Sequence, residues 1–531
     1  MNPDELCGPS PSDKWLIALA VMGVTVMEIL DGTVVNVSLP HIAGTLGADV
    51  HQTTWILTSY DVSSAVVMPI AAWLATFFGR RRLLMFCMVV FAGSSLLCGV
   101  APNLEYLIFF RVLQGLGGGA LQPISMAILL ETFPVRERGM AMGIWGMGVV
   151  LAPICGPLLG GWLSDNLTWR WIFYVNLPIC LLSLTLTMLY IHDPPYIRSQ
   201  RPERIDYLGL GLLCVGMGAL QVLLDKGQLE DWFSSGYICQ LTAIAAIALI
   251  ALIYRELTTE HPIIDLRLFK DRNYADGMTI VFIVTIVRSG SILLLPLFLQ
   301  KLMGYDASTA GWALAFSGIG ALLFSPVVGR MTSIIDSRVL LGVGLALNAY
   351  AVYLFGNFNT HIDFNLAWFP RLIQGFGSAA TIVSLATLTM CCIPKDRMGN
   401  ATGIYNMIGN LGSGFGVAVA TTYLARRAQF HQNRMVEHLT PHSLPFSAWQ
   451  ERLAELFQSP GDYWDIWESR ESLNQLYTQM QNQAWMKSFC DIYWIYTMIF
   501  VALIPLVFLM TRESPPIQCP PEGPRHEIQG S

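Results

Sequence analysis

Charged residues are scarce in this chain. They make up 13% of its 531 residues, about half the share found in an average soluble domain. The sequence has no basic stripe of the kind that binds nucleic acid, no Walker phosphate-binding motif and no H-E-x-x-H zinc motif. Its eleven cysteines form no C-x-x-C pair and no metal-like spacing. These absences argue against a nucleic-acid partner, ATP-driven work and an enzyme, and we expect neither a cofactor nor a metal.

Apolar residues take the place of the missing charges. They make up 53% of the chain, and the mean hydropathy is +0.50. They fall in runs of about 20, the length that an α-helix needs to cross the hydrocarbon core of a bilayer. Only a helix or a closed barrel satisfies its backbone groups in lipid. The sequence therefore predicts an all-α polytopic membrane protein that has the lipid bilayer as its surroundings.

The apolar runs predict fourteen transmembrane helices. They are expected at about 15–39, 53–76, 82–101, 104–131, 138–161, 169–191, 206–224, 237–256, 274–299, 309–332, 338–357, 364–392, 398–423 and 489–511. An even number of spans places both termini on the same side of the membrane.

Basic residues indicate which side that is, because cytoplasmic loops are enriched in Lys and Arg. They gather in alternate loops, at Arg80, Arg81, Arg82, Arg136, Arg138, Arg198, Arg201, Arg204, Arg255, Arg267, Lys270, Arg272, Arg338, Lys395 and Arg397. The short loops on the other side hold almost none. Both termini are therefore predicted to be cytoplasmic.

The chain is predicted to divide into five parts. These are a cytoplasmic N-terminus (1–14), a six-helix bundle (15–192), two linking transmembrane helices with a cytoplasmic loop (193–273), a second six-helix bundle (274–511) that includes a long outer loop (424–488), and a cytoplasmic tail (512–531).

The two bundles repeat one another in sequence. The segment from Arg111 to Gly117 reappears from Arg371 to Gly377, which is 260 positions later (371 − 111). An even number of helices separates the two copies, so they cross the membrane in the same direction. Parallel repeats of this kind occur in transporters that bind their substrate between two halves. The two linking helices have no counterpart in the repeat.

Four motifs in order resemble one transporter family. They are LDGTVVNVSLP from Leu30 to Pro40, the arginine motif from Arg111 to Ala120, the glycine- and proline-rich stretch from Gly148 to Gly161, and WRWIFYVNLP from Trp169 to Pro178. Together they resemble the major facilitator superfamily, in its fourteen-helix drug–proton antiporter branch of the EmrB type. The likeness covers nearly the whole chain.

The resemblance implies an activity. A protein of this branch exports small amphipathic or lipophilic drugs in exchange for protons, by alternating access, across the bacterial inner membrane. It also implies an EmrA-like periplasmic adaptor and an outer-membrane channel as partners. Alternatives are an exporter dedicated to one metabolite, siderophore or fatty acid and, from another class, a membrane receptor or an intramembrane enzyme. The residues of the implied antiporter motif are Gly148, Gly156, Pro157, Gly160 and Gly161.

One motif departs from the family pattern. The loop between the second and third helices has Thr76 and Phe77 where the family has an acid and an arginine. Gly79, Arg80 and Arg81 remain. We expect these three residues to form the cytoplasmic gate, without the acid–arginine pair of the family's latch.

Six charged residues lie at least seven positions from either end of a predicted helix: Glu28, Asp31, Asp61, Arg111, Arg288 and Arg371. Each costs about 2.5–3.5 kcal/mol on insertion scales, so few are kept without a reason. At about 1.5 Å per residue, Asp31, Asp61 and Arg111 lie about 10–13 Å from the outer ends of their helices. These three side chains are therefore predicted to meet in one layer.

A carboxylate between apolar surroundings and an arginine can take up and release a proton. We expect Asp31 or Glu28 to bind the coupling proton with Arg111 as charge partner, and Asp61 is a further candidate. The alternative is a static ion pair that holds two helices together. The sequence does not decide between Glu28 and Asp31.

Other polar residues are expected to line the substrate cavity: Asn36, Gln114, Arg288 and Arg371. Arg288 is predicted to bind an anionic group of the substrate or to pair with Asp31; the alternative partners are a buried backbone carbonyl and some other acid. Arg371 repeats Arg111, but no acid of the second bundle repeats Asp31, and a structural role is favoured for it.

Overall fold

The computed structural model describes residues 13–134, 137–193, 206–259, 262–305, 307–359, 362, 364–394, 397–438 and 470–510. These residues form helices joined by short connections, and no strand occurs among them. The all-α prediction is confirmed. The predicted terminal segments (1–14 and 512–531) lie almost entirely outside the described residues.

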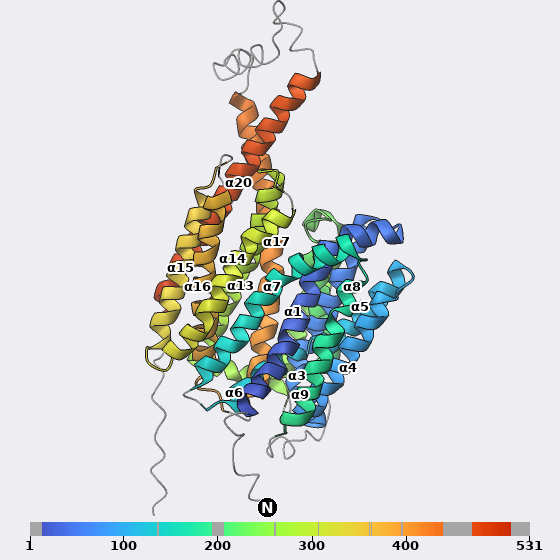
Figure 1. Cartoon of the computed structure of the whole chain (residues 1–531), viewed down its shortest axis with the longest axis vertical. Helices are drawn as coiled ribbons and strands as arrows, with labels where there is room; N and C mark the ends of the chain where they lie inside the picture. The colour runs from blue at the N-terminus through green and yellow to red at the C-terminus, as the bar shows by residue number, and fades with distance from the viewer. Residues whose placement is uncertain are drawn as a thin grey trace, which may run out of the picture.

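The first bundle holds the N-terminal helices, drawn in blue to green in Figure 1. They are α1 (Asp13–Leu46), α2 (Val50–Thr53), α3 (Trp55–Phe78), α4 (Arg80–Gly99), α5 (Leu104–Gly118), α6 (Leu121–Thr132), α7 (Arg138–Asn166), α8 (Trp171–Tyr174) and α9 (Asn176–Tyr190). The pairs α5 with α6 and α8 with α9 each make up one membrane span, so this bundle has six spans.

Two long helices, α11 (Tyr207–Lys226) and α12 (Gly236–Thr258), and two short 3₁₀ turns, η3 (Trp232–Ser234) and η4 (Leu266–Lys270), connect the bundles. The outer helix of this pair faces lipid, because Ile247 and Ile250 of α12 are 70% and 68% exposed. The second bundle consists of α13 (Arg272–Lys301), α14 (Ala307–Met331), α15 (Ser337–Gly356), α16 (Phe364–Met390), α17 (Met398–His438) and α20 (Arg470–Val507).

The two bundles pack alike. In the first bundle α1 packs on α7, α3 on α5 and α4 on α5; in the second bundle the equivalent pairs are α13 with α17, α14 with α16 and α15 with α16. The contacts between bundles are paired in the same way, because α7 packs on α14 and α17 packs on α3. The sequence repeat is therefore a structural repeat.

Thirteen of the described spans are long and apolar enough to cross a membrane. The predicted helix that is missing from these thirteen, 398–423, is present as the first part of α17, but it does not reach the hydropathy of the others. Its sequence, which begins MGNATGIYNMIGNLGSGFG, is rich in glycine and asparagine. Because α17 packs against α3, α6, α13 and α20, it lies between the bundles, where less of its surface meets lipid.

The helices on either side of the predicted outer loop 424–488 are longer than their apolar runs. Helix α17 continues to His438 and α20 begins at Arg470. The extension of α17 is tied to α20 by Asp491, which accepts a hydrogen bond from Arg427 (2.9 Å) and pairs with His431 (2.8 Å). Helix-forming residues and this pairing explain why hydropathy alone placed the end of α17 too early and the start of α20 too late. The amphipathic segment from Trp449 to Phe457 lies outside the described residues.

Three other predicted helices differ in detail. The first predicted helix, 15–39, continues through Pro40 to Leu46 in the structure, because the backbone N–H that proline lacks is a single lost donor and does not end a packed helix. The fourth predicted helix, 104–131, is interrupted at Gly119 and Ala120, between α5 and α6. A Cβ at Gly119 would lie 2.9 Å from the Ser64 Cα, so the glycine lets α3 approach closely. The sixth is divided into α8 and α9.

The bundles contact one another at one end of the molecule. There, a Cβ on Gly139 of α7 would lie 3.0 Å from the Gly329 carbonyl oxygen of α14. Thr402 of α17 donates a hydrogen bond to the Pro123 carbonyl (3.1 Å). We call this end the Gly139 end and the opposite one the Pro40 end.

Candidate functional site

A large cavity lies between the bundles. Its volume is about 1200 Å³, which is above the usual range for a drug-sized ligand. Trp145 and Tyr405 line its inner part, and Pro40, Asp165 and Gln300 line it toward the Pro40 end. Most of its lining is apolar, with a few charged side chains.

The charges that line this cavity are divided between the bundles. The acids among them (Glu28, Asp61 and Asp165) and Arg111 belong to the first bundle, whereas Arg288 comes from the second. One wall of the cavity is therefore acidic and the other is basic.

Asp31 and Arg111 meet behind the acidic wall. The Arg111 Nη1 atom lies 2.5 Å from Asp31 Oδ2, and both side chains are fully buried. Asp31 Oδ1 also accepts hydrogen bonds from Gln114 (2.9 Å) and Asn176 (2.7 Å). The structure thus brings two residues of α5 and one of α9 together around one carboxylate of α1.

The Arg111 guanidinium is enclosed on its other sides as well. Its Nε donates to the Ile56 carbonyl (3.1 Å), and the ring of Tyr60 lies 4.2 Å from its central carbon. Such contacts stabilise a cation in apolar surroundings. Asp31 itself is not among the residues that line the cavity.

Glu28 lies one helical turn before Asp31 and has different partners. Its carboxylate faces the cavity and accepts a hydrogen bond from Gln122 of α6 (2.5 Å). Among the described residues it has no ion pair. Protonation of Glu28 would therefore break no salt bridge in this conformation, whereas protonation of Asp31 would remove the counter-charge of Arg111.

Asp61 of α3 lines the same cavity, and so does Asn36 of α1. Sequence reasoning missed a neighbour of Asp61, which is Asp225 on the linking helix α11. Asp225 accepts a hydrogen bond from Gln221 (3.3 Å). It escaped notice because the predicted helix ended at 224, whereas α11 continues to Lys226.

In the second bundle, Arg371 binds Gln374, and Gln374 in turn donates to Ser291 (3.2 Å). Arg371 is 1% exposed. Its Nε and Nη2 atoms have no hydrogen-bond partner among the described residues. The ring of Phe355 lies 5.9 Å from its guanidinium carbon.

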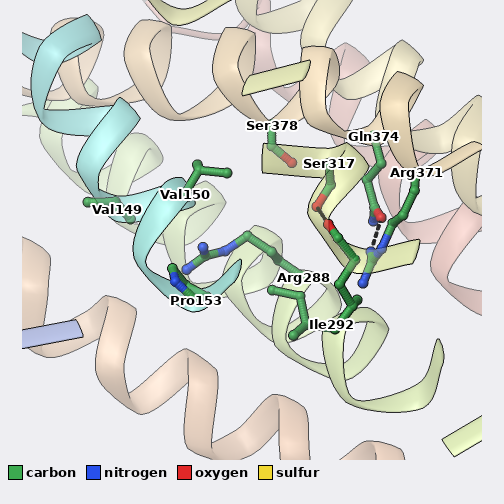
Figure 2. A pocket seen from close by; sticks show the side chains of 10 residues that line it. Val149, Val150, Pro153, Arg288, Ile292, Ser317, Arg371, Gln374 and Ser378 are labelled. Atoms are coloured by element: carbon green, nitrogen blue, oxygen red, sulfur yellow. Dashed lines mark hydrogen bonds between the residues drawn. The ribbon is translucent and has the colours of Figure 1, made fainter. Parts of the chain in front are cut away.

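Arg371 and Arg288 line one small recess of about 40 Å³. Figure 2 shows the Arg288 side chain extending from α13 toward Val150 and Pro153 of α7, so that it reaches across from the second bundle to the first. Five residues line both the recess and the large cavity, namely Val149, Pro153, Arg288, Ile292 and Leu314. The recess is therefore a side pocket of the cavity.

The glycines of the predicted antiporter motif allow α7 to pack closely on α1. A Cβ on Gly160 would lie 2.9 Å from the Val34 carbonyl oxygen, one on Gly148 would lie 3.0 Å from Val26, and one on Gly156 would collide with Thr33. Gly161 has no neighbour within 4 Å and lines the cavity with Pro157.

The three residues predicted for the gate lie at the Gly139 end. Gly79 has a φ angle of +82°, which favours glycine, and it separates α3 from α4. Arg80 forms an ion pair with Glu131 of α6. The backbone N–H of Arg81 donates to Asp193 (2.8 Å), and its side chain donates to the Met188 carbonyl (2.5 Å).

Comparison with known proteins identifies the family to which this architecture belongs. The family model described as Major Facilitator Superfamily matches residues 21–269 and 277–431. The chain is 36% identical over 496 residues to the multidrug export protein EmrB of Escherichia coli (strain K12), covering 93% of this chain and 94% of that protein. It is 37% identical over 483 residues to the fatty acid resistance protein FarB of Neisseria gonorrhoeae, covering 91% and 93%.

Solved structures show the same fold. The proton:xylose symporter XylE superposes with a TM-score of 0.59 at 13% identity, covering 94% of this chain and 96% of that one. The human organic anion transporter MFSD10 superposes with the same TM-score at 12% identity.

Proposed function

The chain belongs to the major facilitator superfamily, and from that premise we propose that it is a proton-coupled antiporter that exports small amphipathic or lipophilic compounds by alternating access. It is a multi-pass membrane protein and not an enzyme. The identity to multidrug export proteins over more than nine-tenths of the chain supports the export of drugs.

The observation that carries the proposal is the large cavity between the two bundles, with Glu28 and Asp61 on its wall. Its volume and apolar lining suit an amphipathic compound, and its carboxylates offer sites for protons. The bundles touch at the Gly139 end and the cavity extends to the Pro40 end, which supports a cycle in which access alternates between these two ends.

We assign the proton-loading step to Glu28, with Asp61 as a second carboxylate on the same wall. Glu28 faces the cavity and has a neutral partner, Gln122. The Asp31–Arg111 pair is enclosed and holds α1 against α5. In this scheme Asp31 and Arg111 position the helix that carries Glu28. Movement of α1 during the cycle would loosen the pair and make Asp31 available as well.

The proposed location is the bacterial cytoplasmic membrane, with both termini and the Gly139 end in the cytoplasm. The alternation of basic loops in the sequence supports this orientation. The Pro40 end, with the extended helices α17 and α20, then faces the periplasm and is the place where an EmrA-like adaptor and an outer-membrane channel would join.

Dye efflux from proteoliposomes under an imposed pH gradient tests the proposal. Wild type should accumulate dye only with the gradient. Glu28→Gln should lose gradient-driven accumulation while still exchanging dye for dye, because the cycle survives but the proton is no longer carried. Asp31→Asn should lose both. Gradient-independent movement by wild type would refute proton coupling.

The adaptor needs a separate test. Deletion of residues 439–469 should leave efflux in proteoliposomes intact and abolish drug resistance of cells. Unchanged resistance would refute a contact between this segment and an adaptor.

A further inference from the structure

Two adjacent thiols lie side by side where α16 ends. Cys391 and Cys392 directly follow Met390, the last residue of the helix, and their sulfur atoms are 3.1 Å apart. Both are free thiols; Cys392 is exposed and Cys391 is half-buried. No other two of the eleven cysteines are adjacent in the sequence. We call this pair the dithiol.

Helix α13 packs against the dithiol. In its first turn the buried Asn273 places its amide nitrogen 3.8 Å from the Cys391 sulfur and 3.9 Å from the Cys392 sulfur. One turn later, a Cβ on Gly277 would collide with Thr389 of α16, so the two helices are in close contact. The two sulfurs therefore share one neighbour on a closely packed helix.

The repeat shows which residue the dithiol replaces. Cys391 stands 260 positions after Glu131 (391 − 131), the interval that also relates Arg111 to Arg371. In the first bundle Glu131 forms an ion pair with Arg80. The second bundle thus has a thiol at the position where the first bundle has the acid of its cytoplasmic ion pair.

The dithiol also lies where the two bundles meet. Arg138, which precedes Gly139 at the start of α7, is buried and interacts electrostatically with both Cys391 and Glu131. Helix α7 packs against α16. A guanidinium close to a thiol favours its thiolate, the form that attacks electrophiles and binds soft ions. A cation of the first bundle therefore faces a thiol of the second at the Gly139 end.

The number of sulfurs limits the ligand. Thiolates select soft elements, whose bonds to sulfur are about 2.3 Å long in the case of zinc, so one atom can bridge sulfurs 3.1 Å apart. Structural zinc takes four ligands, and no group of three or more His, Cys, Asp or Glu placed to hold a metal occurs in the described part of the chain. A trivalent arsenic atom that carries one organic group needs only two sulfurs.

We propose that the dithiol is a binding site for trivalent organoarsenicals and that occupation of this site inhibits transport. The inference goes beyond the proposed function, because neither cysteine lines the large cavity. With phenylarsine oxide, two S–As bonds form, the bond between arsenic and oxygen breaks, and the oxygen leaves as water with the two thiol protons. Arsenic stays trivalent, so no oxidant or reductant takes part.

Inhibition follows from the place of the site. The bound arsenic adds a phenyl group beside Cys391, at the end where α7 and α16 pack and where Arg138 faces the thiol. The added bulk opposes the contact between the bundles at the Gly139 end. A cycle that must close and open this end is then slowed.

Intact mass spectrometry of the purified full-length protein in nanodiscs tests the site. The probe is phenylarsine oxide, with a phosphine reductant that keeps the thiols reduced. Wild type should carry one phenylarsenic group, which 2,3-dimercaptopropanol removes and 2-mercaptoethanol at the same concentration does not. Wild type should bind the probe at least about tenfold more tightly than Cys392→Ser, because the second thiol adds to the first at high effective concentration.

Cys239→Ser is the matched control, because Cys239 is also an exposed free thiol and its sulfur contacts the Phe233 carbonyl. It should keep the phenylarsenic group. The absence of the group from wild type, or equal binding by wild type and Cys392→Ser, would overturn the proposed site. This measurement needs no gradient and no transport, so failure of the antiporter proposal leaves its result intact.

Dye efflux in proteoliposomes tests the inhibition. Phenylarsine oxide at the concentration that saturates the dithiol should slow efflux by wild type and by Cys239→Ser, and 2,3-dimercaptopropanol should restore it. Cys392→Ser should transport dye with the probe as without it. Undiminished efflux by wild type that carries the phenylarsenic group would overturn the proposed inhibition.

Discussion

Ser291 stands in the second bundle where Asp31 stands in the first. Each is bound by the glutamine that also binds the buried arginine of its bundle: Gln114 joins Arg111 to Asp31, and Gln374 joins Arg371 to Ser291. The same framework therefore holds a neutral ion pair on one side of the molecule and a lone cation on the other. A single side chain decides which of the two is present.

Ser291→Asp should convert the second arrangement into the first. The new carboxylate would neutralise the buried Arg371 as Asp31 neutralises Arg111, so the unfolding midpoint should rise above that of wild type. Thermal unfolding in detergent measures this midpoint. Ser291→Asn adds similar bulk without charge and should not raise the midpoint. If both variants change the midpoint alike, the bulk at position 291 and not the charge is responsible.

Asp31 and Glu28 should differ sharply in their effect on stability. Asp31→Asn leaves Arg111 buried without a counter-charge, a change that typically costs about 3–5 kcal/mol. Glu28→Gln removes a carboxylate that has no ion pair among the described residues, so its cost should be below about 1 kcal/mol. Thermal unfolding in detergent, followed by tryptophan fluorescence, should show a clear fall of the midpoint for Asp31→Asn alone. Equal midpoints would show that the pair with Arg111 does not stabilise the bundle.

Much of this architecture follows from local sequence. Apolar runs place the helices because a bilayer accepts little else, and the Asp31–Arg111 contact follows from similar depths in neighbouring helices. The repeat, once aligned on Arg111 and Arg371, gives the two bundles. These features depend on length, spacing and charge, which the sequence displays directly.

Other features depend on packing. The sequence shows that Glu28 and Asp31 share a helix face, but not that Gln122 meets the first and Arg111 the second. The match of Ser291 with Asp31 was missed because reasoning from charge looks for acids and passes over a serine. Tertiary contacts of α17 and α20 likewise extend the helices beyond their apolar runs.

Gly156 should tolerate no larger side chain. A Cβ there would collide with Thr33 of α1, so Gly156→Val should separate α7 from α1, lower the unfolding midpoint and abolish dye efflux in proteoliposomes. Gly93→Val is the control, since Gly93 lies on α4 with nothing within 4 Å of its Cβ position. It introduces the same β-branched residue into a transmembrane helix and should leave both properties near those of wild type. Equal damage by both variants would point to helix propensity and not to the contact between α1 and α7.

Asp206 should make the start of α11 sensitive to pH. Its carboxylate accepts hydrogen bonds from the Gly209 N–H (3.0 Å) and from Arg255 Nε (3.0 Å). Burial acts in the opposite direction, but these hydrogen bonds and the charge of Arg255 prevail and lower the pKa of Asp206. Because the pKa is lower in the folded state, the stabilisation is present above the ordinary pKa of Asp, about 3.9, and is lost as the pH falls through the folded value.

Hydrogen exchange of the amides in the first turn of α11 measures this local stability. Asp206→Ala removes the helix cap, worth about 1 kcal/mol, so exchange at pH 7 should be about fivefold faster than in wild type. Asp206→Asn keeps a capping side chain and loses only the charge, so its effect at pH 7 should be smaller. The difference between wild type and Asp206→Asn should shrink as the pH falls below about 3.9 and through the folded pKa of Asp206, because the wild-type carboxyl group then becomes protonated. If the difference stays constant down to the lowest pH at which the protein remains folded, the charge on Asp206 does not hold α11 to Arg255 of α12, and the cap alone fixes the start of the helix.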